Sequence, residues 1–227
     1  MFSKSKTIIL VALEDELPKK YLPTWNIIYT GVGKINAAYS LSKAIHEFAP
    51  NTVINFGTAG ALSNNLNGIQ EVSVFKQRDM NAEGLGFGLG ETPFDKISTI
   101  DNKRMGLSCG TGDSFVNTKP KLLTDLVDME AYALAKICKL NQIEFICYKY
   151  ISDNADSNAN NAWNENLKNV SNVKIEMLKL VFTYFFYAFA LLLVFLGAFF
   201  LLWMVLTKEQ IDLVPPSNKV MIDSATE

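Results

Sequence analysis

Residues 25–56 of this 227-residue chain read WNIIYTGVGKINAAYSLSKAIHEFAPNTVINF, and this stretch decides the fold. WNIIYT at its start and TVINF at its end are short apolar runs of the kind that form buried strands. Between them, apolar residues recur at three- and four-residue steps from Ile35 to Phe48, which predicts an amphipathic helix that ends near Pro50. A strand, a helix and a second strand in succession form the basic unit of an α/β sheet.

The alternation continues on both sides of this stretch. Further strands are expected at 7–13, 71–75, 104–109 and 143–151, and further helices at about 129–140 and 162–180. The chain therefore predicts a three-layer α/β fold, in which helices flank a central sheet that is mostly parallel or mixed. We expect residues 1–179 to form this domain.

Polar residues and glycines follow the predicted strands. These strand ends are Glu14–Glu16, Gly31–Gly33, Gly57–Gly60, Gly110–Asp113 and Ser152–Asp153. In α/β sheets, ligands bind beyond the carboxyl ends of the strands. We therefore expect these strand ends to converge on one pocket.

The composition limits the chemistry that this pocket can perform. With 21 Lys and Arg against 23 Asp and Glu, the net charge is -2 and there is no basic block, so nucleic acid is not an expected partner. His46 is the only histidine and lies in the predicted helix, which argues against catalytic His pairs and multi-His metal sites. The three widely spaced cysteines fit neither a disulfide framework nor a zinc site, which indicates a reducing compartment. We expect catalysis by carboxylates, with no metal and no organic cofactor.

The C-terminal part of the chain differs sharply in composition. The 28 residues from Leu180 to Thr207 carry no charge, and as a helix they would exceed the roughly 30 Å hydrocarbon core of a bilayer. A buried core helix is the alternative, but the domain already has its helices. The sequence thus predicts a transmembrane helix at 180–207, a polar tail at 208–227, and a single-pass membrane location with the α/β domain cytoplasmic.

Six short motifs connect the chain to a known family. They are ALEDELP (12–18), TGVGKINAAYS (30–40), INFGTAGAL (54–62), TGDSFV (111–116), VDMEAYALAKIC (127–138) and ISDNAD (151–156). In this order they resemble the nucleoside phosphorylase/nucleosidase superfamily, and within it they look most like methylthioadenosine/S-adenosylhomocysteine nucleosidases. The resemblance covers residues 7 to about 180. It implies a nucleoside phosphorylase-like fold and an N-glycosidase that releases adenine from a 5′-modified adenine nucleoside.

Two carboxylates match the catalytic residues of that family. By the resemblance, Asp153 is the general acid that supports protonation of the purine leaving group, and Glu16 orients the attacking water. N-glycosidic cleavage builds an oxocarbenium-like sugar and a poor anionic leaving group, so a carboxyl group beside the base lowers the barrier. Asp153 could instead merely cap a turn, and Glu14 or Asp15 could take the place of Glu16.

The resemblance also implies a ribose site. Glu130, preceded by Met129, matches the glutamate that accepts hydrogen bonds from the ribose hydroxyls. The alternative is that Asp128 and Glu130 only cap the helix that follows them.

The purine site follows from the same resemblance. Phe115 and Val116 match the positions where a ring stacks on the base and the main chain contacts its edge, although a Phe after a strand is more often core. Ser152 would lie beside the base, and Thr58 would lie near the water or anion site.

The treatment of phosphate separates a hydrolase from a phosphorylase. A phosphorylase usually holds phosphate with arginines in the early glycine loop and before the later G-T-A-G turn. Here those places carry Gly31–Lys34 and Asn55, and only Arg78 and Arg104 exist in the chain. We therefore expect water as the nucleophile. The alternatives are a phosphate-dependent purine nucleoside phosphorylase and a catalytically weak, membrane-bound nucleoside-binding module.

The chain departs from the family in its connecting segments. Those between Gly60 and Gly110, and between Phe115 and Met129, are shorter than in typical members, which leaves the 5′ substituent open. Because family members often complete the 5′ pocket with a neighbouring subunit, the resemblance implies a homodimer. The expected partners are therefore a small-molecule nucleoside, a second copy of the chain, and the membrane through residues 180–207.

Overall fold

In the computed structural model, the stretch that begins at Trp25 folds as β2 (Asn26–Tyr29), α1 (Lys34–Phe48) and β3 (Thr52–Ala61). The predicted strand, helix and strand are therefore present. α1 starts after Gly33, whose φ of 96° is a conformation that favours glycine, and it ends at Ala49 in the left-handed region. Ala37, Leu41 and Ala44 bury the inner face of α1 in the core.

The structure describes residues 4–63, 65–168, 194–201 and 203–204. The chain divides into two compact units, residues 1–178 and residues 179–227, and each is described by itself. The first unit contains the sheet and the helices that pack on it.

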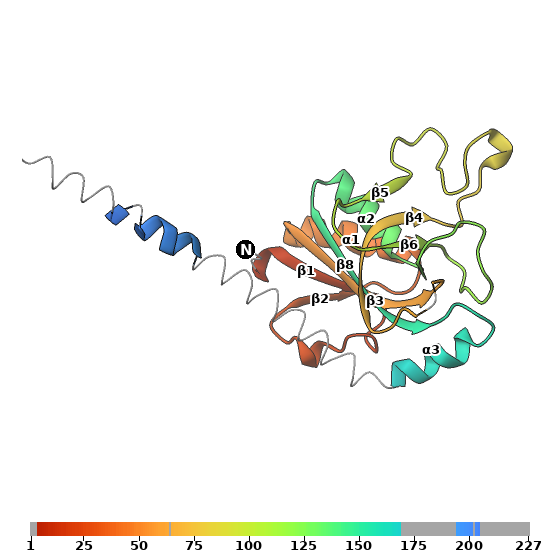
Figure 1. The fold of residues 1–227 in the computed structure, drawn as a ribbon, viewed down its shortest axis with the longest axis horizontal. Helices are drawn as coiled ribbons and strands as arrows, with labels where there is room; N and C mark the ends of the chain where they lie inside the picture. Colours follow the sequence, from red (N-terminus) through yellow and green to blue (C-terminus); the bar gives the residue numbers. More distant parts are fainter. Residues whose placement is uncertain (1–3, 64, 169–193, 202, 205–227) are drawn as a thin grey trace, which may run out of the picture. The chain divides into compact units, whose positions relative to one another are not determined.

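The remaining elements of the first unit follow in sequence order. The strands are β1 (Thr7–Val11), β4 (Ile69–Gln77), β5 (Thr99–Asp101), β6 (Leu107–Thr111), β7 (Leu126–Asp128) and β8 (Glu144–Asp153). The longer helices are α2 (Ala131–Leu140) and α3 (Ala159–Lys168), and the short 3₁₀ turns are η1 (Lys4–Lys6), η2 (Lys19–Tyr21) and η3 (Glu83–Leu85). Figure 1 shows α1 packed beside α2, whereas α3 packs next to β8.

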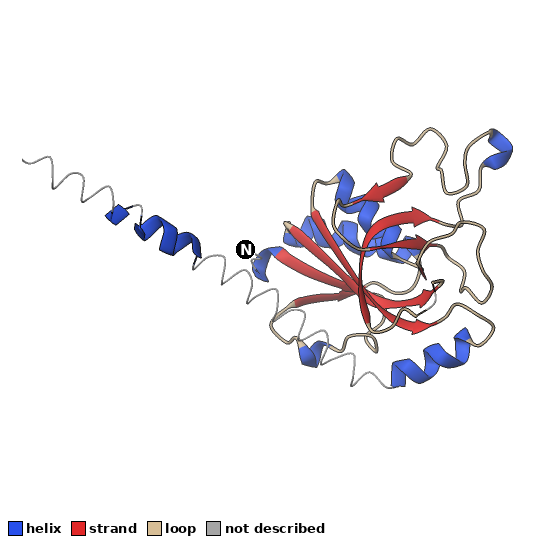
Figure 2. Cartoon of the chain, in the orientation of Figure 1, coloured by secondary structure: helices blue, strands red, loops and turns tan. Residues whose placement is uncertain are grey.

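The strands form a mixed sheet, as predicted. β1 is parallel to β2 and β3, β8 is parallel to β3, and β6 is parallel to both β4 and β7. β7 runs antiparallel to β3, and β4 runs antiparallel to β5 and β8. Because β8 pairs with both β3 and β4, the strands close into a ring, β3–β8–β4–β6–β7–β3, from which β1 and β2 extend (Figure 2). The closed ring brings the ends of distant strands together, which positions the site.

Several strands differ in length from the prediction. β3 and β8 run for 10 residues each and extend past the predicted ends at 56 and 151. Gly57–Gly60 and Ser152–Asp153 therefore lie inside strands, not after them, because β3 and β8 pair along this region up to a bulge at Gly60. β5 and β7 are not among the predicted strands, because they have only 3 residues each and give almost no periodic signal.

The prediction of a single-pass membrane protein is wrong for the part of the chain that the structure describes. Within the described residues, no helix is both long enough and apolar enough to cross a bilayer. Of the range 180–207, only 194–201 and 203–204 are described, and they are helical. The rest of that range and the tail at 208–227 lie outside the described residues.

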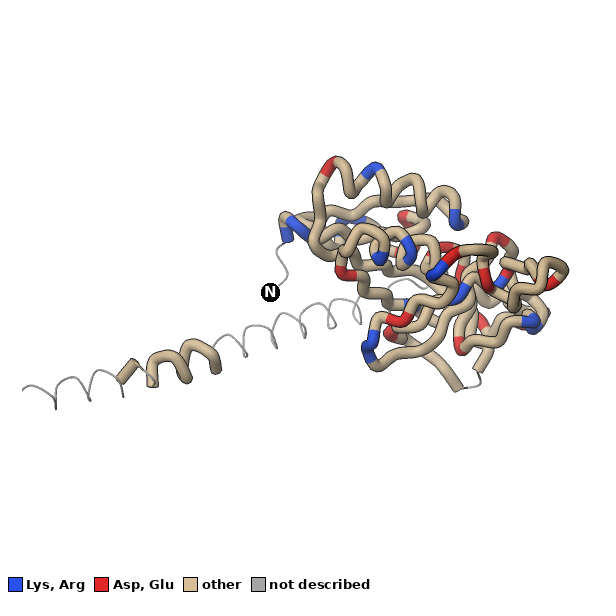
Figure 3. Tube along the Cα trace, turned by 90° about the horizontal axis from the view of Figure 1, so that it is seen from above, with Lys and Arg blue, Asp and Glu red and all other residues tan. Residues whose placement is uncertain are grey.

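Charged residues are intermingled along the trace of the first unit, as Figure 3 shows. One pair is an exception because it is buried in the interior. The Lys149 Nζ lies 2.7 Å from the Asp128 Oδ2, and both side chains are only 1% exposed. Burying two charges is costly unless they are paired and hydrogen-bonded, so this pair needs further partners. Asp128 finds them at the start of α2, next to the pocket.

Candidate active site

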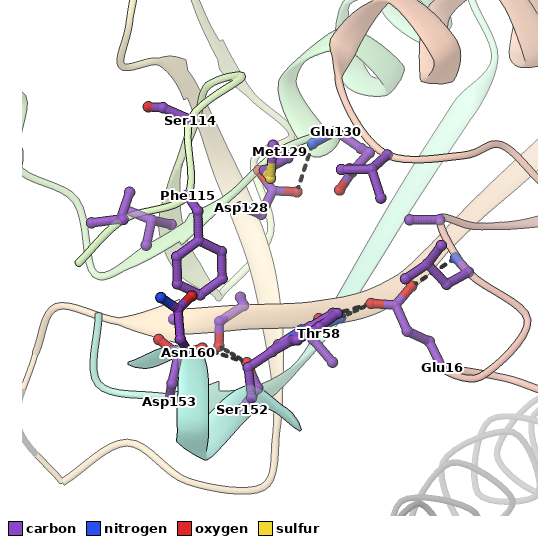
Figure 4. A pocket seen from close by; sticks show the side chains of 18 of the residues that line it. Glu16, Thr58, Ser114, Phe115, Asp128, Met129, Glu130, Ser152, Asp153 and Asn160 are labelled. Atoms are coloured by element: carbon purple, nitrogen blue, oxygen red, sulfur yellow. Dashed lines mark hydrogen bonds between the residues drawn. The ribbon is translucent and has the colours of Figure 1, made fainter. Parts of the chain in front are cut away.

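One pocket of about 350 Å³ opens among the strand ends of the ring. All the site residues that the sequence analysis proposed lie in its wall: Glu16, Thr58, Phe115, Val116, Met129, Glu130, Ser152 and Asp153. The other lining residues are Ala12, Leu13, Val32, Ala59, Gly60, Arg78, Ser114, Val127, Asp128, Asn160 and Trp163. Figure 4 shows Glu16 and Asp153 in different parts of this wall, with Thr58 and Ser152 between them.

Glu16 is held at one end of the pocket by three hydrogen bonds. Its Oε1 accepts from the backbone N–H of Thr58 at 2.8 Å and from the Thr58 hydroxyl at 2.8 Å. Its Oε2 accepts from the Leu13 N–H at 3.1 Å. Glu16 is 6% exposed, whereas Glu14 and Asp15 in the same turn are exposed. Of the three acids, Glu16 is therefore the one that reaches the pocket.

Asp153 occupies a different wall and is also buried, at 8% exposure. Its Oδ2 accepts from the Ser152 hydroxyl at 2.7 Å, and its Oδ1 accepts from the Ala155 N–H at 2.8 Å. The bond to Ala155 is the turn cap that the sequence analysis considered. The capping interaction does not remove Asp153 from the pocket, so the two roles are compatible.

Of the two acids that could cap α2, only Asp128 does so through its side chain. Asp128 caps α2, because its Oδ2 accepts from the Ala131 N–H at 2.8 Å and from the Glu130 N–H at 3.3 Å. The Glu130 side chain makes no capping hydrogen bond. Instead its Oε1 accepts from the Gly33 N–H at 2.8 Å. Glu130 thus ties the glycine loop before α1 to the pocket wall.

The buried charged groups Glu130, Asp128 and Lys149 shift one another's pKa values. Burial and the neighbouring Asp128 carboxylate raise the pKa of Glu130 to about 7. Burial acts to lower the pKa of Lys149, but the charge of Asp128 and other nearby acids outweighs it, so this pKa lies above its usual range. Burial likewise acts to raise the pKa of Asp128, but Lys149 and the hydrogen bonds outweigh it, so this pKa is lowered. Asp128 and Lys149 therefore stay charged, while Glu130 titrates near neutrality.

The proposed purine side of the pocket is held by an arginine that the sequence analysis did not assign to the site. Arg78 donates through Nη1 to the Ser114 hydroxyl at 3.1 Å, and through Nη2 to the Gly112 carbonyl at 3.0 Å and to the Ser114 carbonyl. These bonds fix the segment that leads into Phe115 and Val116. Phe115 remains 42% exposed, so it is not part of the core. Figure 4 shows its ring directed toward the side of the pocket that holds Asp153.

Lys34, the cation of the glycine loop, is paired with acids. Its Nζ lies 2.7 Å from the Asp79 Oδ1 and 3.6 Å from the Asp113 Oδ2. Its backbone N–H also donates to the Asp113 Oδ1 at 2.8 Å. The carboxylates therefore occupy the place where this loop would offer a positive charge to phosphate.

Helix α3 supplies side chains that the sequence analysis missed. Asn160 and Trp163 line the pocket. The Trp163 Nε1–H donates to the Thr58 Oγ1 at 3.2 Å, and the Asn166 Nδ2 donates to the Ser152 carbonyl at 2.7 Å. The spacing of these residues by three could have suggested a helix face, but their long-range partners are not visible in the sequence.

The arrangement suits acid and base chemistry by carboxylates on a neutral or cationic ligand. Two acids lie in different walls of one pocket, and a third carboxylate with a raised pKa lies in another wall. Among the residues that the structure describes, no group of three or more His, Cys, Asp or Glu side chains could hold a metal ion.

Comparison with known proteins places the chain among nucleoside-processing enzymes. The model of the Phosphorylase superfamily matches residues 23–96 and 109–185. The 5′-methylthioadenosine/S-adenosylhomocysteine nucleosidase of Staphylococcus carnosus is 31% identical over 176 residues, which cover 65% of this chain and 77% of that protein. Among solved structures, the nucleosidase of the same name from Helicobacter pylori has a TM-score of 0.67 at 21% identity, over 78% of this chain and 97% of the other. A futalosine hydrolase of Helicobacter pylori has a TM-score of 0.67 at 20% identity, over 76% and 96%. At these identities the two solved structures show a shared fold.

Proposed function

The chain belongs to the phosphorylase superfamily and, within it, to the 5′-methylthioadenosine/S-adenosylhomocysteine nucleosidase family, and from this premise we propose that it hydrolyses the N-glycosidic bond of a 5′-modified adenine nucleoside. The observation that carries the proposal is the placement of two buried, hydrogen-bonded carboxylates, Glu16 and Asp153, in different walls of one pocket. A nucleoside between them would have one acid beside the base and one carboxylate beside the sugar.

In the proposed reaction, the bond between C1′ of the ribose and the purine nitrogen breaks, and its electron pair goes to the base. Asp153 supports protonation of the base at N7, which makes it a better leaving group. Glu16 orients a water whose oxygen bonds to C1′, and it accepts a proton from that water. Glu130 accepts hydrogen bonds from the ribose hydroxyls, with Met129 beside it.

The other lining residues have supporting roles in this proposal. Phe115 packs against the face of the purine, and the main chain at Val116 meets its edge. Ser152 lies beside the base, and its hydroxyl donates a hydrogen bond to Asp153. Thr58 lies beside the water and donates to Glu16.

The ion pairs of two lysines and the hydrogen bonds of Arg78 support water over phosphate as the nucleophile. Lys34 is bound to Asp79, Lys149 is bound to Asp128, and the Arg78 guanidinium donates to the segment before Phe115. A phosphorylase must present such charges to a dianion, because phosphate binding relies on charge-assisted hydrogen bonds.

We propose methylthioadenosine and S-adenosylhomocysteine as the substrates, because the matching relatives carry these names. The test uses the full chain with both compounds and a panel of other purine nucleosides, each with and without inorganic phosphate. We expect free adenine and a free sugar, at a rate that phosphate does not change. A sugar phosphate formed only with phosphate would indicate a phosphorylase, and binding without turnover would indicate a binding module. Either result would overturn the proposal.

We also propose that the chain forms a homodimer. Ile35 and Tyr39 are 81% and 71% exposed, and they lie four residues apart on one face of α1. Val32, just before this helix, is 42% exposed and lines the pocket. An apolar strip that starts at the pocket rim would be covered by a second copy of the chain.

Light scattering tests the dimer. The native chain should have the mass of a dimer, and Ile35→Lys should shift it toward a monomer. Leu85→Lys is the matched control, because Leu85 is also exposed, at 73%, but lies away from α1 in η3. A native monomer with full activity would contradict the proposal.

A further inference from the structure

Helix α3 presents one face to the pocket region through three side chains spaced three residues apart. Asn160 and Trp163 line the pocket, and Trp163 and Asn166 reach the strands that carry the proposed catalytic machinery. The Asn166 Nδ2 donates to the carbonyl of Ser152, directly before Asp153. The Trp163 Nε1–H donates to Thr58 on β3, and Thr58 in turn donates to Glu16. One short helix thus contacts both ends of the pocket.

The hydrogen bonds between Trp163, Thr58 and Glu16 have a fixed direction. An indole N–H can only donate, and an ionised carboxylate can only accept. The Thr58 hydroxyl between them therefore accepts from the Trp163 Nε1 at 3.2 Å and gives its one proton to the Glu16 Oε1 at 2.8 Å. Trp163 thus prevents this hydroxyl from turning away from Glu16.

We propose that Trp163 is a positioning residue, which holds the Glu16 carboxylate in its water-orienting place through the hydroxyl of Thr58. The proposal rests on the function proposed above for Glu16. Trp163 lies 147 positions beyond Glu16 in the sequence, so the relay exists only when α3 is packed against β8 and Trp163 reaches Thr58 on β3. The order of α3 is therefore coupled to the geometry of the carboxylate.

The relay strengthens the hold on Glu16 in two ways. A hydroxyl that accepts a hydrogen bond becomes a better donor, because the bonds in a chain polarise one another. The hydroxyl is also restricted to one rotamer, so Oε1 keeps both of its Thr58 donors at the same time. Loss of the indole N–H should leave substrate binding almost unchanged and slow the chemical step.

The first test is the kinetics of Trp163→Phe in the full chain. Phe keeps an aromatic ring in the pocket wall but lacks the second ring of the indole together with its N–H, and the loss of the hydrogen bond should lower kcat about three- to tenfold while KM stays nearly constant. Trp25→Phe is the matched control, because it also removes an indole N–H, but from a buried residue outside the pocket. An unchanged kcat for Trp163→Phe, or a change in KM alone, would overturn the proposal.

A double-mutant cycle separates the relay from a general loss of packing. Thr58→Val removes the hydroxyl but keeps the branched shape, and it should lower kcat about ten- to a hundredfold because the lost bond is to a charged group. In that background, Trp163→Phe should lower kcat no further. Thr58→Ser keeps the hydroxyl and should retain the effect of Trp163→Phe. Additive losses in the Thr58→Val background would contradict the relay.

The indole N–H signals in an NMR spectrum of the ¹⁵N-labelled protein test the relay without any substrate. The chain has three Trp residues, and Trp163→Phe identifies the signal of Trp163 by its disappearance. That signal should move upfield in Thr58→Val, as for a lost hydrogen bond, and stay in place in Thr58→Ser. An unmoved signal refutes the relay itself. If the signal moves but the native chain cleaves no nucleoside, the hydrogen bonds are present. The catalytic role of Glu16 is then refuted, and the positioning role of Trp163 with it.

Discussion

The two ends of the pocket hold their carboxylates in different ways. Glu16 depends on donors that are distant in sequence, since Thr58 supplies two of its hydrogen bonds from β3 and Trp163 supports Thr58 from α3. Asp153 depends on its own neighbours, because its donors are the hydroxyl of Ser152 and the N–H of Ala155. Both acids are buried to nearly the same degree, so burial does not explain the difference.

The comparison teaches how each role depends on the fold. The place of Asp153 is defined by a local turn, which any conformation that preserves β8 will keep. The place of Glu16 requires three segments to be packed at once. Changes at the Glu16 end should therefore have larger and more widely distributed effects than matched changes at the Asp153 end.

Glu16→Gln should have the largest effect, a loss of about a thousandfold in kcat. The substitution removes the charge that we propose orients the water. It also puts an NH₂ group where a carboxylate oxygen now accepts from Leu13 or Thr58, so one donor faces another. Glu14→Gln, an exposed position in the same turn, is the control and should retain its activity. Near-normal turnover of Glu16→Gln in a folded protein would remove Glu16 from the mechanism.

Asp153→Asn should lower kcat by about a hundredfold, because proton donation to the base is lost while the local turn can still form. Asp156→Asn is the matched control, since the exposed Asp156 also caps a turn, through the N–H of Asn158 at 2.9 Å, but does not line the pocket. The release of adenine measures the rate, and circular dichroism confirms folding. If the two variants have equal turnover, Asp153 acts only as a cap.

Much of the fold could be predicted from the sequence because it depends on local periodicity. The β2–α1–β3 unit and the mixed sheet follow from runs of apolar residues. The closure of the ring could not be predicted, because the pairing of β8 with both β3 and β4 is a tertiary property. The membrane helix was inferred from composition alone, and within the described residues the structure contains no helix that meets the requirement.

Site residues that belong to a family motif were predicted, whereas site residues that only a long-range contact brings to the pocket were missed. Glu16 and Asp153 belong to motifs at strand ends, and both line the pocket. Arg78 and Trp163 belong to no quoted motif, and their partners lie 36 and 105 positions away. Lys149 was read as part of a buried strand, yet a lysine in the apolar run EFICYKYISD is itself a signal of a buried ion pair.

The third carboxylate, Glu130, predicts a pH dependence of KM. In the proposed ribose site the hydroxyls donate hydrogen bonds to Glu130, so they would bind its ionised form best. Because burial and Asp128 raise its pKa to about 7, ionisation is incomplete below neutrality. KM for the nucleoside should therefore rise about tenfold between about pH 8 and pH 6. A KM that is constant over this range would contradict the ribose role.

The variant Glu130→Gln provides the control for this pH dependence. Its KM should be high and nearly independent of pH, because the titrating group is gone. The raised pKa of Glu130 should also make the stability of the folded protein depend on pH. A raised pKa means that the folded state binds the proton more tightly, so this contribution to stability is present below about pH 4.5 and is lost as the pH rises through about 7. The Tm of Glu130→Gln minus the Tm of the native chain should thus be more positive at about pH 8 than at about pH 5.

The smallest effect is expected for Ser152→Ala, which removes the only side-chain donor to Asp153 among the described residues. The Ala155 N–H still holds the other carboxylate oxygen, so the local turn should keep Asp153 in place and kcat should fall only about threefold. The matched change at the other end, Thr58→Ala, also deletes a hydroxyl that donates to a proposed catalytic carboxylate, but that hydroxyl accepts a hydrogen bond from Trp163 and donates to Glu16, the proposed water-orienting acid. We therefore expect Thr58→Ala to lose several times more activity than Ser152→Ala when kcat is measured with the same nucleoside. Equal losses would mean that the local and the long-range holds are equivalent, and the contrast between the two ends of the pocket would then have no catalytic consequence.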